Sequence, residues 1–150
     1  MSKPELEQPL LSVKNLAVQF HQNGQTINAV HSLSFDVYSG KTLAIVGESG
    51  SGKSVSTLSL LQLLPKDSAS TPRGSAWYQN IDLLNANEAE IRSIRGNHIG
   101  MIFQEPMTSL NPLHTIEKQI GESLRLHRKF DKAQARARTI ELLTLVGIPD

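Results

Sequence analysis

The segment Gly47–Ser54, GESGSGKS, has residue types and a spacing that suit phosphate binding. It matches the pattern G-x-x-x-x-G-K-[ST] at every fixed position. Glycines lack a Cβ, so the backbone can wrap an anion with its N–H groups pointing inward. Lys53 can place a positive charge on the outer phosphates, and the Ser54 hydroxyl is a hard oxygen ligand for Mg²⁺. We therefore expect the whole segment to bind a nucleotide through Gly47, Glu48, Ser49, Gly50, Ser51, Gly52, Lys53 and Ser54.

The residues on either side of this segment predict the elements that position it. Thr42–Val46 (TLAIV) is a short apolar run bounded by glycines, which favours a strand buried on both faces, as in a parallel α/β sheet. A helix is predicted from Lys53 to Leu64 and ends at Pro65. The free amides at its start would add to the anion site. This strand–loop–helix context favours a phosphate loop over the alternative, a merely flexible Gly/Ser turn.

Two further strands, Leu10–Phe20 and Ala29–Tyr38, precede the loop, and Asn23-Gly24 marks a turn between them. Their patterns predict an antiparallel hairpin rather than part of a parallel sheet. A second buried strand is expected at His98–Phe103 (HIGMIF). Shorter elements are expected in between, a strand at Ser75–Tyr78 and a helix at Asn87–Ile94.

Gln104 directly follows the predicted strand His98–Phe103. A glutamine amide offers both an acceptor and donors, so at the end of a buried strand it can reach Mg²⁺ and the attacking water and sense a γ-phosphate. Taken alone, a glutamine before two prolines is more often a plain loop residue, so the pattern makes Gln104 one candidate for nucleotide binding, for the metal together with Ser54, and for catalysis together with Lys53.

The chain becomes helical after Glu105. One predicted helix carries apolar positions at Ile116, Ile120, Leu124 and His127. A second begins at Asp131, three residues before Gln134, which is a variant of the capping box. Its apolar face is expected to hold Ala133, Ala137, Ile140, Leu143 and Val146, and Gly147 and Pro149 end it. The domain prediction is a flexible leader at residues 1–9, a nucleotide-binding α/β core at 10–104, and a loop with the start of a helical subdomain at 105–150.

Composition excludes several classes of protein. The chain has 150 residues, a formal charge of +1, 39% hydrophobic and 19% charged residues, and no Cys. A disordered tail, a disulfide framework and a nucleic-acid-binding domain are therefore disfavoured. No apolar run reaches the ~18–20 residues that cross a bilayer, and the first ten residues do not form a signal peptide. The expected place is the cytoplasm, with any membrane link supplied by a partner.

The two motifs GESGSGKS and FQEPMTSLNP, followed by a helical segment closing on LLTLVGIP, resemble the ATP-binding-cassette (ABC) transporter ATPases. The FQEPMTSLNP form is similar to the branch that serves oligopeptide, dipeptide and nickel importers, including peptide and microcin C uptake. The resemblance implies an α/β P-loop NTPase core with an N-terminal antiparallel β subdomain and the start of a helical subdomain. It also implies ATP and Mg²⁺ as cofactors.

The resemblance assigns further roles. Gln104 would be the Q-loop glutamine, and Glu105–Asn111 the hinge that touches a membrane subunit. Met107 and Leu110, apolar residues in a proline-bounded loop, also favour a partner surface. Phe20 would stack on the adenine, with a core residue as the equal alternative and His21 as another candidate for stacking.

The implied partners are membrane permease subunits, a second ATPase cassette and, indirectly, a solute-binding protein, with no nucleic acid. The implied place is the cytoplasmic face of the inner membrane, bound peripherally. Two other functions remain open: a soluble ABC ATPase acting on ribosomes or DNA, and a non-hydrolysing nucleotide-binding module.

The sequence departs from the family pattern in what it does not contain. No signature segment of the LSGGQ type, no apolar run ending in Asp-Glu and no late switch histidine occurs in it. The chain therefore resembles the first part of a cassette, and the fold is expected to be incomplete. We expect the full-length parent to be an ATP hydrolase and residues 1–150 alone to be inactive.

Overall fold

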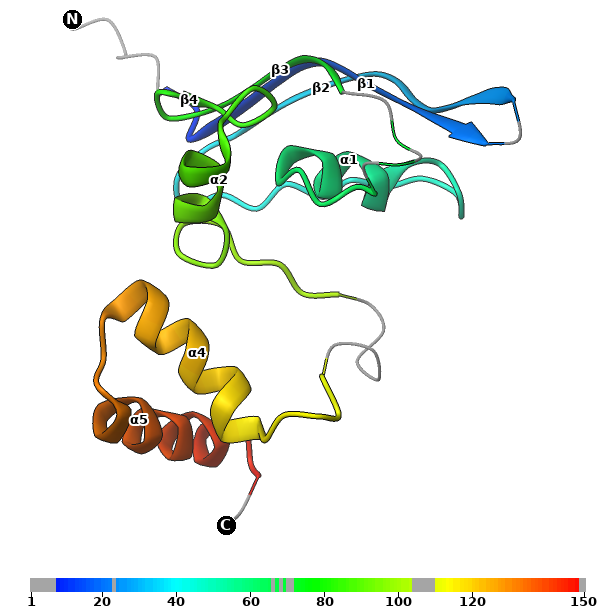
Figure 1. Ribbon diagram of the computed structural model, residues 1–150. Coiled ribbons are helices and arrows are strands. Elements are labelled where there is room, and N and C mark those ends of the chain that lie inside the picture. The colour runs from blue at the N-terminus through cyan, green and yellow to red at the C-terminus, as the bar shows by residue number, and fades with distance from the viewer. Residues whose placement is uncertain are drawn as a thin grey trace, which may run out of the picture. The chain divides into compact units, whose positions relative to one another are not determined.

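The computed structural model describes residues 8–22, 24–65, 67, 69, 72–103 and 110–148 (Figure 1). The chain divides into two compact units, Met1–Arg92 and Ser93–Asp150. The predicted leader lies mostly outside the described residues, and so does most of the predicted hinge after Gln104. The predicted division at residues 104 and 105 stays a prediction. Across the described part of the chain, no helix has the length and apolar character needed to cross a membrane.

The first unit is built on a four-stranded antiparallel sheet with the order β2-β1-β3-β4. Its strands are β1 (Leu11–Gln22), β2 (Gln25–Val37), β3 (Arg73–Tyr78) and β4 (Ile81–Asp82). The pairs Leu11↔Val37 and Gln22↔Gln25 mark the two ends of the β1–β2 hairpin. The predicted hairpin is therefore confirmed, with strands longer than expected.

Helix α1 (Lys53–Leu60) covers one face of this hairpin and contacts both β1 and β2 (Figure 1). Strand β1 contributes the fully buried Val13, Leu16 and Val18 to the core. The helix buries two serines, Ser56 and Ser59, whose hydroxyls donate to backbone oxygens of its own first turns at 2.9 and 2.7 Å. Small side chains that satisfy their own hydroxyls let the helix approach the sheet closely. The start of α1 is thereby held against the hairpin.

A polar cluster fixes the register of the β1–β2 hairpin at the end away from its turn, where β1 begins and β2 ends. The carboxylate of Asp36 accepts from the Ser12 hydroxyl at 2.6 Å and from the Lys14 ammonium at 2.9 Å. The hydrogen bond from Ser12, followed by that from Lys14, lowers the pKa of Asp36 below its ordinary value. These bonds join β1 to β2 across the pair Ser12↔Asp36.

The two apolar segments predicted as buried strands form no strand. Thr42–Val46 leads into the glycine-rich loop without pairing, and its Val46 is 89% exposed. In His98–Phe103, only Ile99 takes part in an isolated bridge, to Arg95, and Ile102 is fully exposed. A buried parallel strand requires neighbours on both edges, and among the described residues these two segments have no partner strand beyond the single bridge of Ile99 to Arg95. Most of their apolar side chains are therefore exposed, and none of them is fully buried.

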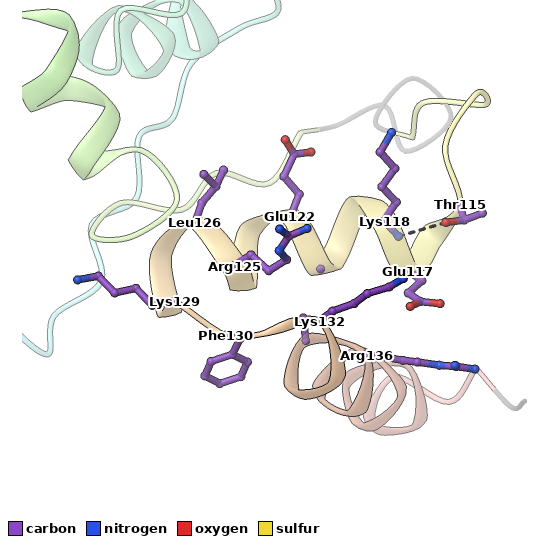
Figure 2. A pocket seen from close by; sticks show the side chains of 12 residues that line it. Thr115, Glu117, Lys118, Glu122, Arg125, Leu126, Lys129, Phe130, Lys132 and Arg136 are labelled. Atoms are coloured by element: carbon purple, nitrogen blue, oxygen red, sulfur yellow. Dashed lines mark hydrogen bonds between the residues drawn. The ribbon is translucent and has the colours of Figure 1, made fainter.

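In the second unit the described residues form α4 (Ile116–Arg128) and α5 (Lys132–Leu145), after the short α2 (Glu88–Ile94) that spans the boundary. Helix α5 begins at the predicted capping box, in which Gln134 N–H donates to Asp131 at 2.8 Å and Asp131 N–H donates to Gln134 at 3.0 Å. Figure 2 shows Thr115 at the start of α4, where its hydroxyl accepts from Lys118 N–H at 3.2 Å. Both helix starts are therefore capped by side chains.

The packing of α5 on α4 differs from the predicted apolar face. The buried residues of α5 are Ala135 and Thr139, one turn apart, whereas Ile140 and Val146 of the predicted face are exposed. Gly121 of α4 is buried, and a Cβ added to it would lie 3.8 Å from the Cβ of Ala135. Small residues at the crossing bring the two helices close together, so small size rather than apolar character selects the buried face.

Candidate nucleotide-binding loop

The loop Gly47–Ser54 connects the unpaired segment Thr42–Val46 to the start of α1. A turn forms inside it, with Ser51 N–H donating to the Glu48 carbonyl at 3.2 Å. Gly50 and Gly52 have φ angles of 80° and 87°, in the left-handed region that favours glycine. Glycine is therefore required at positions 50 and 52 by the backbone path itself.

Lys53 folds back over this loop. Its ammonium donates to the carbonyl oxygens of Gly47 and Glu48, each at 2.7 Å, and to the Ser51 hydroxyl at 3.4 Å. An ammonium has three N–H donors, so these contacts occupy all of them. A phosphate that draws on Lys53 would replace one or more of these contacts, because the donors are already directed at the loop.

The N-terminus of helix α1 is open to an anion. Its N-cap is Gly52, no side chain caps it, and its first turn has no acidic residue. The first amides of a helix lack intrahelical partners and carry a partial positive charge of about half a unit. Ser54 is exposed in this first turn. The loop thus combines unpaired helix amides, an ammonium group and an exposed hydroxyl, which is the donor set that a phosphate with a bound cation requires.

Gly52 also fixes the position of the loop on the sheet. A Cβ built on Gly52 would overlap the carbonyl oxygen of Ala29 in β2 and lie 3.1 Å from Cγ2 of Val30. Gly52 is itself buried. The backbone at the helix start therefore rests directly on β2, and the sequence motif alone gave no signal for this contact.

The candidates for stacking on a base lie in strand β1. Phe20 is half-buried, pairs with Ile27 of β2 and forms an isolated bridge with Ala69 on the other side. His21 is exposed, and its Nδ1 lies 3.1 Å from the Thr26 hydroxyl. These placements leave Phe20 and His21 as predictions.

Gln104 lies outside the described residues, so its nucleotide, metal and catalytic roles stay predictions. The residue before it, Phe103, is 55% exposed. Leu110, beyond the segment 104–109, is exposed, as a partner surface would require.

A groove of about 760 Å³ lies between α4 and α5 (Figure 2). Its lining includes Glu122, Arg125, Lys129 and Arg136, with Leu126 and Phe130 as apolar members. None of the residues predicted to bind the nucleotide belongs to it. Much of this lining comes from the segment Arg125–Arg138, which is rich in basic residues.

Comparison with known proteins gives a consistent set of relatives. The family model described as ABC transporter matches residues 30–150. The chain is similar to the peptidoglycan transport ATP-binding protein YejF of Agrobacterium fabrum, with 58% identity over 141 residues, 94% of this chain and 26% of the relative. It is also similar to the dipeptide transport ATP-binding protein DppD of Bacillus subtilis, with 50% identity over 141 residues, 94% of this chain and 42% of the relative.

A solved dimeric structure of a bacterial ABC transporter cassette superimposes with a TM-score of 0.75 at 25% identity, covering 90% of this chain and 56% of that chain. This match confirms the predicted fold class, an incomplete α/β P-loop core with an antiparallel sheet and the start of a helical part. The chain spans about a quarter to two-fifths of the length of the two curated relatives above.

Proposed function

Because the chain belongs to the ABC transporter family, as its motifs predicted, we propose that it forms the nucleotide-binding part of an importer ATPase for peptides or related small solutes. The observation that carries this proposal is the loop Gly47–Ser54, where the Lys53 ammonium lies beside the uncapped start of α1. The solute class is supported by the relatives named for peptidoglycan and dipeptide transport.

The described residues fit ATP with Mg²⁺. The open helix start and the donors of Lys53 would hold the outer phosphates, and the exposed Ser54 hydroxyl would be a ligand of the cation. Bound Mg²⁺ would neutralise the charge that develops on the phosphates during transfer. Lys53 would move from the loop carbonyls to the phosphates, and Gln104 would orient the attacking water and help to hold the cation.

The proposed partners follow from this role. A second cassette would complete the nucleotide site. Membrane permease subunits would respond to the conformational change that ATP binding and hydrolysis cause in the cassettes, and a solute-binding protein would deliver the solute to the permease. The dimeric form of the solved bacterial cassette supports the first of these partners. The protein would then work at the cytoplasmic face of the membrane, attached through the permease.

The experiment that tests this function uses the full-length protein that contains these residues. We expect it to co-purify with membrane subunits. In vesicles, we expect it to hydrolyse ATP faster when a peptide is added on the side of the membrane where the solute-binding protein acts. Purification with ribosomes or DNA and no membrane subunit would favour a soluble ABC ATPase instead. ATP binding with no hydrolysis under any condition would favour a regulatory nucleotide-binding module.

Replacing Gln104 by alanine in the full-length protein is expected to spare ATP binding and to lower transport-coupled hydrolysis by roughly 10-fold or more. The reason is that the side chain would act on the water and the cation rather than on the binding of the phosphates. Equilibrium titration with a fluorescent ATP analogue, alongside peptide-stimulated phosphate release, separates the two effects. Coupled turnover at the parental rate would show that Gln104 has no such role.

Residues 1–150 alone are expected to bind ATP weakly and to release no phosphate above background. Phosphoryl transfer to water needs an oriented water and compensated charge as well as a held phosphate. The sequence holds no acidic motif or signature segment to complete these requirements. Measurement of phosphate release from monodisperse residues 1–150 tests this prediction. Steady ATP hydrolysis that is lost in the Lys53→Ala variant would contradict it and would reveal a further catalytic group among these residues.

A further inference from the structure

We propose that Gln119 is a positioning residue that ties the loop Asn111–His114 to helix α4, so that this loop and the helix move as one body. The inference rests on the function proposed above, since it concerns how the ATPase is coupled to its membrane subunits. Nothing in the motifs singles out Gln119, which lies in the second turn of α4.

The side chain of Gln119 makes three hydrogen bonds to the backbone of this loop. Its Oε1 accepts from Asn111 N–H at 2.9 Å. Its Nε2 donates to the carbonyl oxygens of Asn111 and His114, both at 2.9 Å. Asn111 therefore has both of its backbone polar groups paired with one side-chain amide, as a neighbouring strand would pair them.

The loop is closed on itself by further bonds within the same unit. Leu113 N–H donates to Oδ1 of Asn111 at 2.9 Å, and His114 N–H donates to the Asn111 carbonyl at 3.1 Å. Thr115 then caps α4. Asn111 is thus the point at which the loop is anchored, and Gln119 is the residue that anchors it to the helix.

This anchored loop carries exposed apolar side chains. Leu113 is 87% exposed and Leu110 is 53% exposed. Exposed leucines on a fixed loop suit contact with an apolar surface of a membrane subunit. Because Gln119 joins the loop to α4, a displacement at either end would be passed on rather than absorbed. Asn111 is also close in the chain to Gln104, whose proposed role is to respond to the γ-phosphate.

The test uses the full-length protein assembled with its membrane subunits. In Gln119→Ala, the Asn111 amide is expected to exchange with deuterium about ten-fold faster, because its hydrogen bond is lost, while the amides of α4 keep their protection. ATP affinity and unstimulated hydrolysis should remain parental. The stimulation of hydrolysis by solute should fall by roughly five-fold or more, because a coupling contact is lost.

Two further variants sharpen the test. Gln119→Glu loses both donated bonds and sets a carboxylate oxygen against the carbonyl oxygens of Asn111 and His114, so we expect faster exchange at Asn111 and reduced stimulation, as in Gln119→Ala. Gln134→Ala is the matched control, since it removes a glutamine that bonds to backbone at the start of α5 and should leave both readouts parental.

The possible failures are distinguishable. Unchanged exchange at Asn111 in Gln119→Ala, or parental stimulation in both Gln119 variants, would overturn the role of Gln119. An equal loss of stimulation in Gln134→Ala would also overturn it, because the effect would then be one of general stability. Absence of solute stimulation in the unmutated protein would instead overturn the proposed importer function.

Discussion

Replacing Lys53 by alanine is expected to weaken ATP binding by roughly 10- to 150-fold, the equivalent of about 1.5–3 kcal/mol for a hydrogen bond to a charged group. The ammonium is the single cationic side chain within the loop Gly47–Ser54, and its three donors are already gathered at that loop. Titration of the full-length protein with a fluorescent ATP analogue measures the change.

The loss of Lys53 also removes the contacts that it makes to the loop without nucleotide. Those contacts are exposed, so their removal should cost little stability, about 1 kcal/mol or less. Unfolding without nucleotide therefore separates a binding defect from a folding defect. Lys41→Ala is the matched control, because it deletes an exposed lysine from the same unit without touching the loop. Equal ATP affinity in Lys53→Ala and Lys41→Ala would contradict the assignment of Lys53 as a phosphate-binding residue.

Local signals in the sequence predicted those parts of the fold that are themselves local. The capping box at Asp131 and Gln134 is present because both partners lie within one helical turn. The β1–β2 hairpin formed because its two strands are adjacent in the chain and alternate in polarity. The loop Gly47–Ser54 could be predicted because a phosphate loop is one contiguous segment with glycines and a lysine at fixed spacing.

Features that depend on distant neighbours could not be predicted in this way. An apolar run such as Thr42–Val46 indicates that burial would be favourable, but it does not identify the strand that would lie beside it. Among the described residues, no strand pairs with this segment. The buried face of α5 was predicted wrongly because Ala135 and Thr139 are selected by the close approach of Gly121 on another helix. The anchoring role of Gln119 belongs to the same class, since an amide in a helix has no pattern that identifies its backbone partners.

Gly52→Ala is expected to have the largest effect on folding of any single substitution in the loop. Its φ angle of 87° costs a residue with a Cβ about 1–2 kcal/mol. The added methyl group would in addition overlap the Ala29 carbonyl and crowd Val30, and overpacking of this kind costs about 1–3 kcal/mol. We therefore expect a loss of about 2–5 kcal/mol in the free energy of unfolding.

Gly50→Ala separates the two contributions. Gly50 has a similar φ angle, 80°, but an added Cβ would have no heavy atom within 4 Å. It should therefore lose only the conformational part, about 1–2 kcal/mol. Denaturant unfolding of both variants of the full-length protein, without nucleotide, measures the difference.

The same comparison decides how the nucleotide site is held. If Gly52 supports the loop by resting on β2, then Gly52→Ala must push the start of α1 away from the sheet, because the added Cβ would overlap a backbone atom, the Ala29 carbonyl oxygen, rather than the end of a flexible side chain. The open helix amides and Lys53 would be displaced together, and ATP affinity would fall along with stability. Equal stabilities of the two variants would mean that the contact with β2 is dispensable, and that the loop is positioned by its own turn and by the bonds of Lys53 alone.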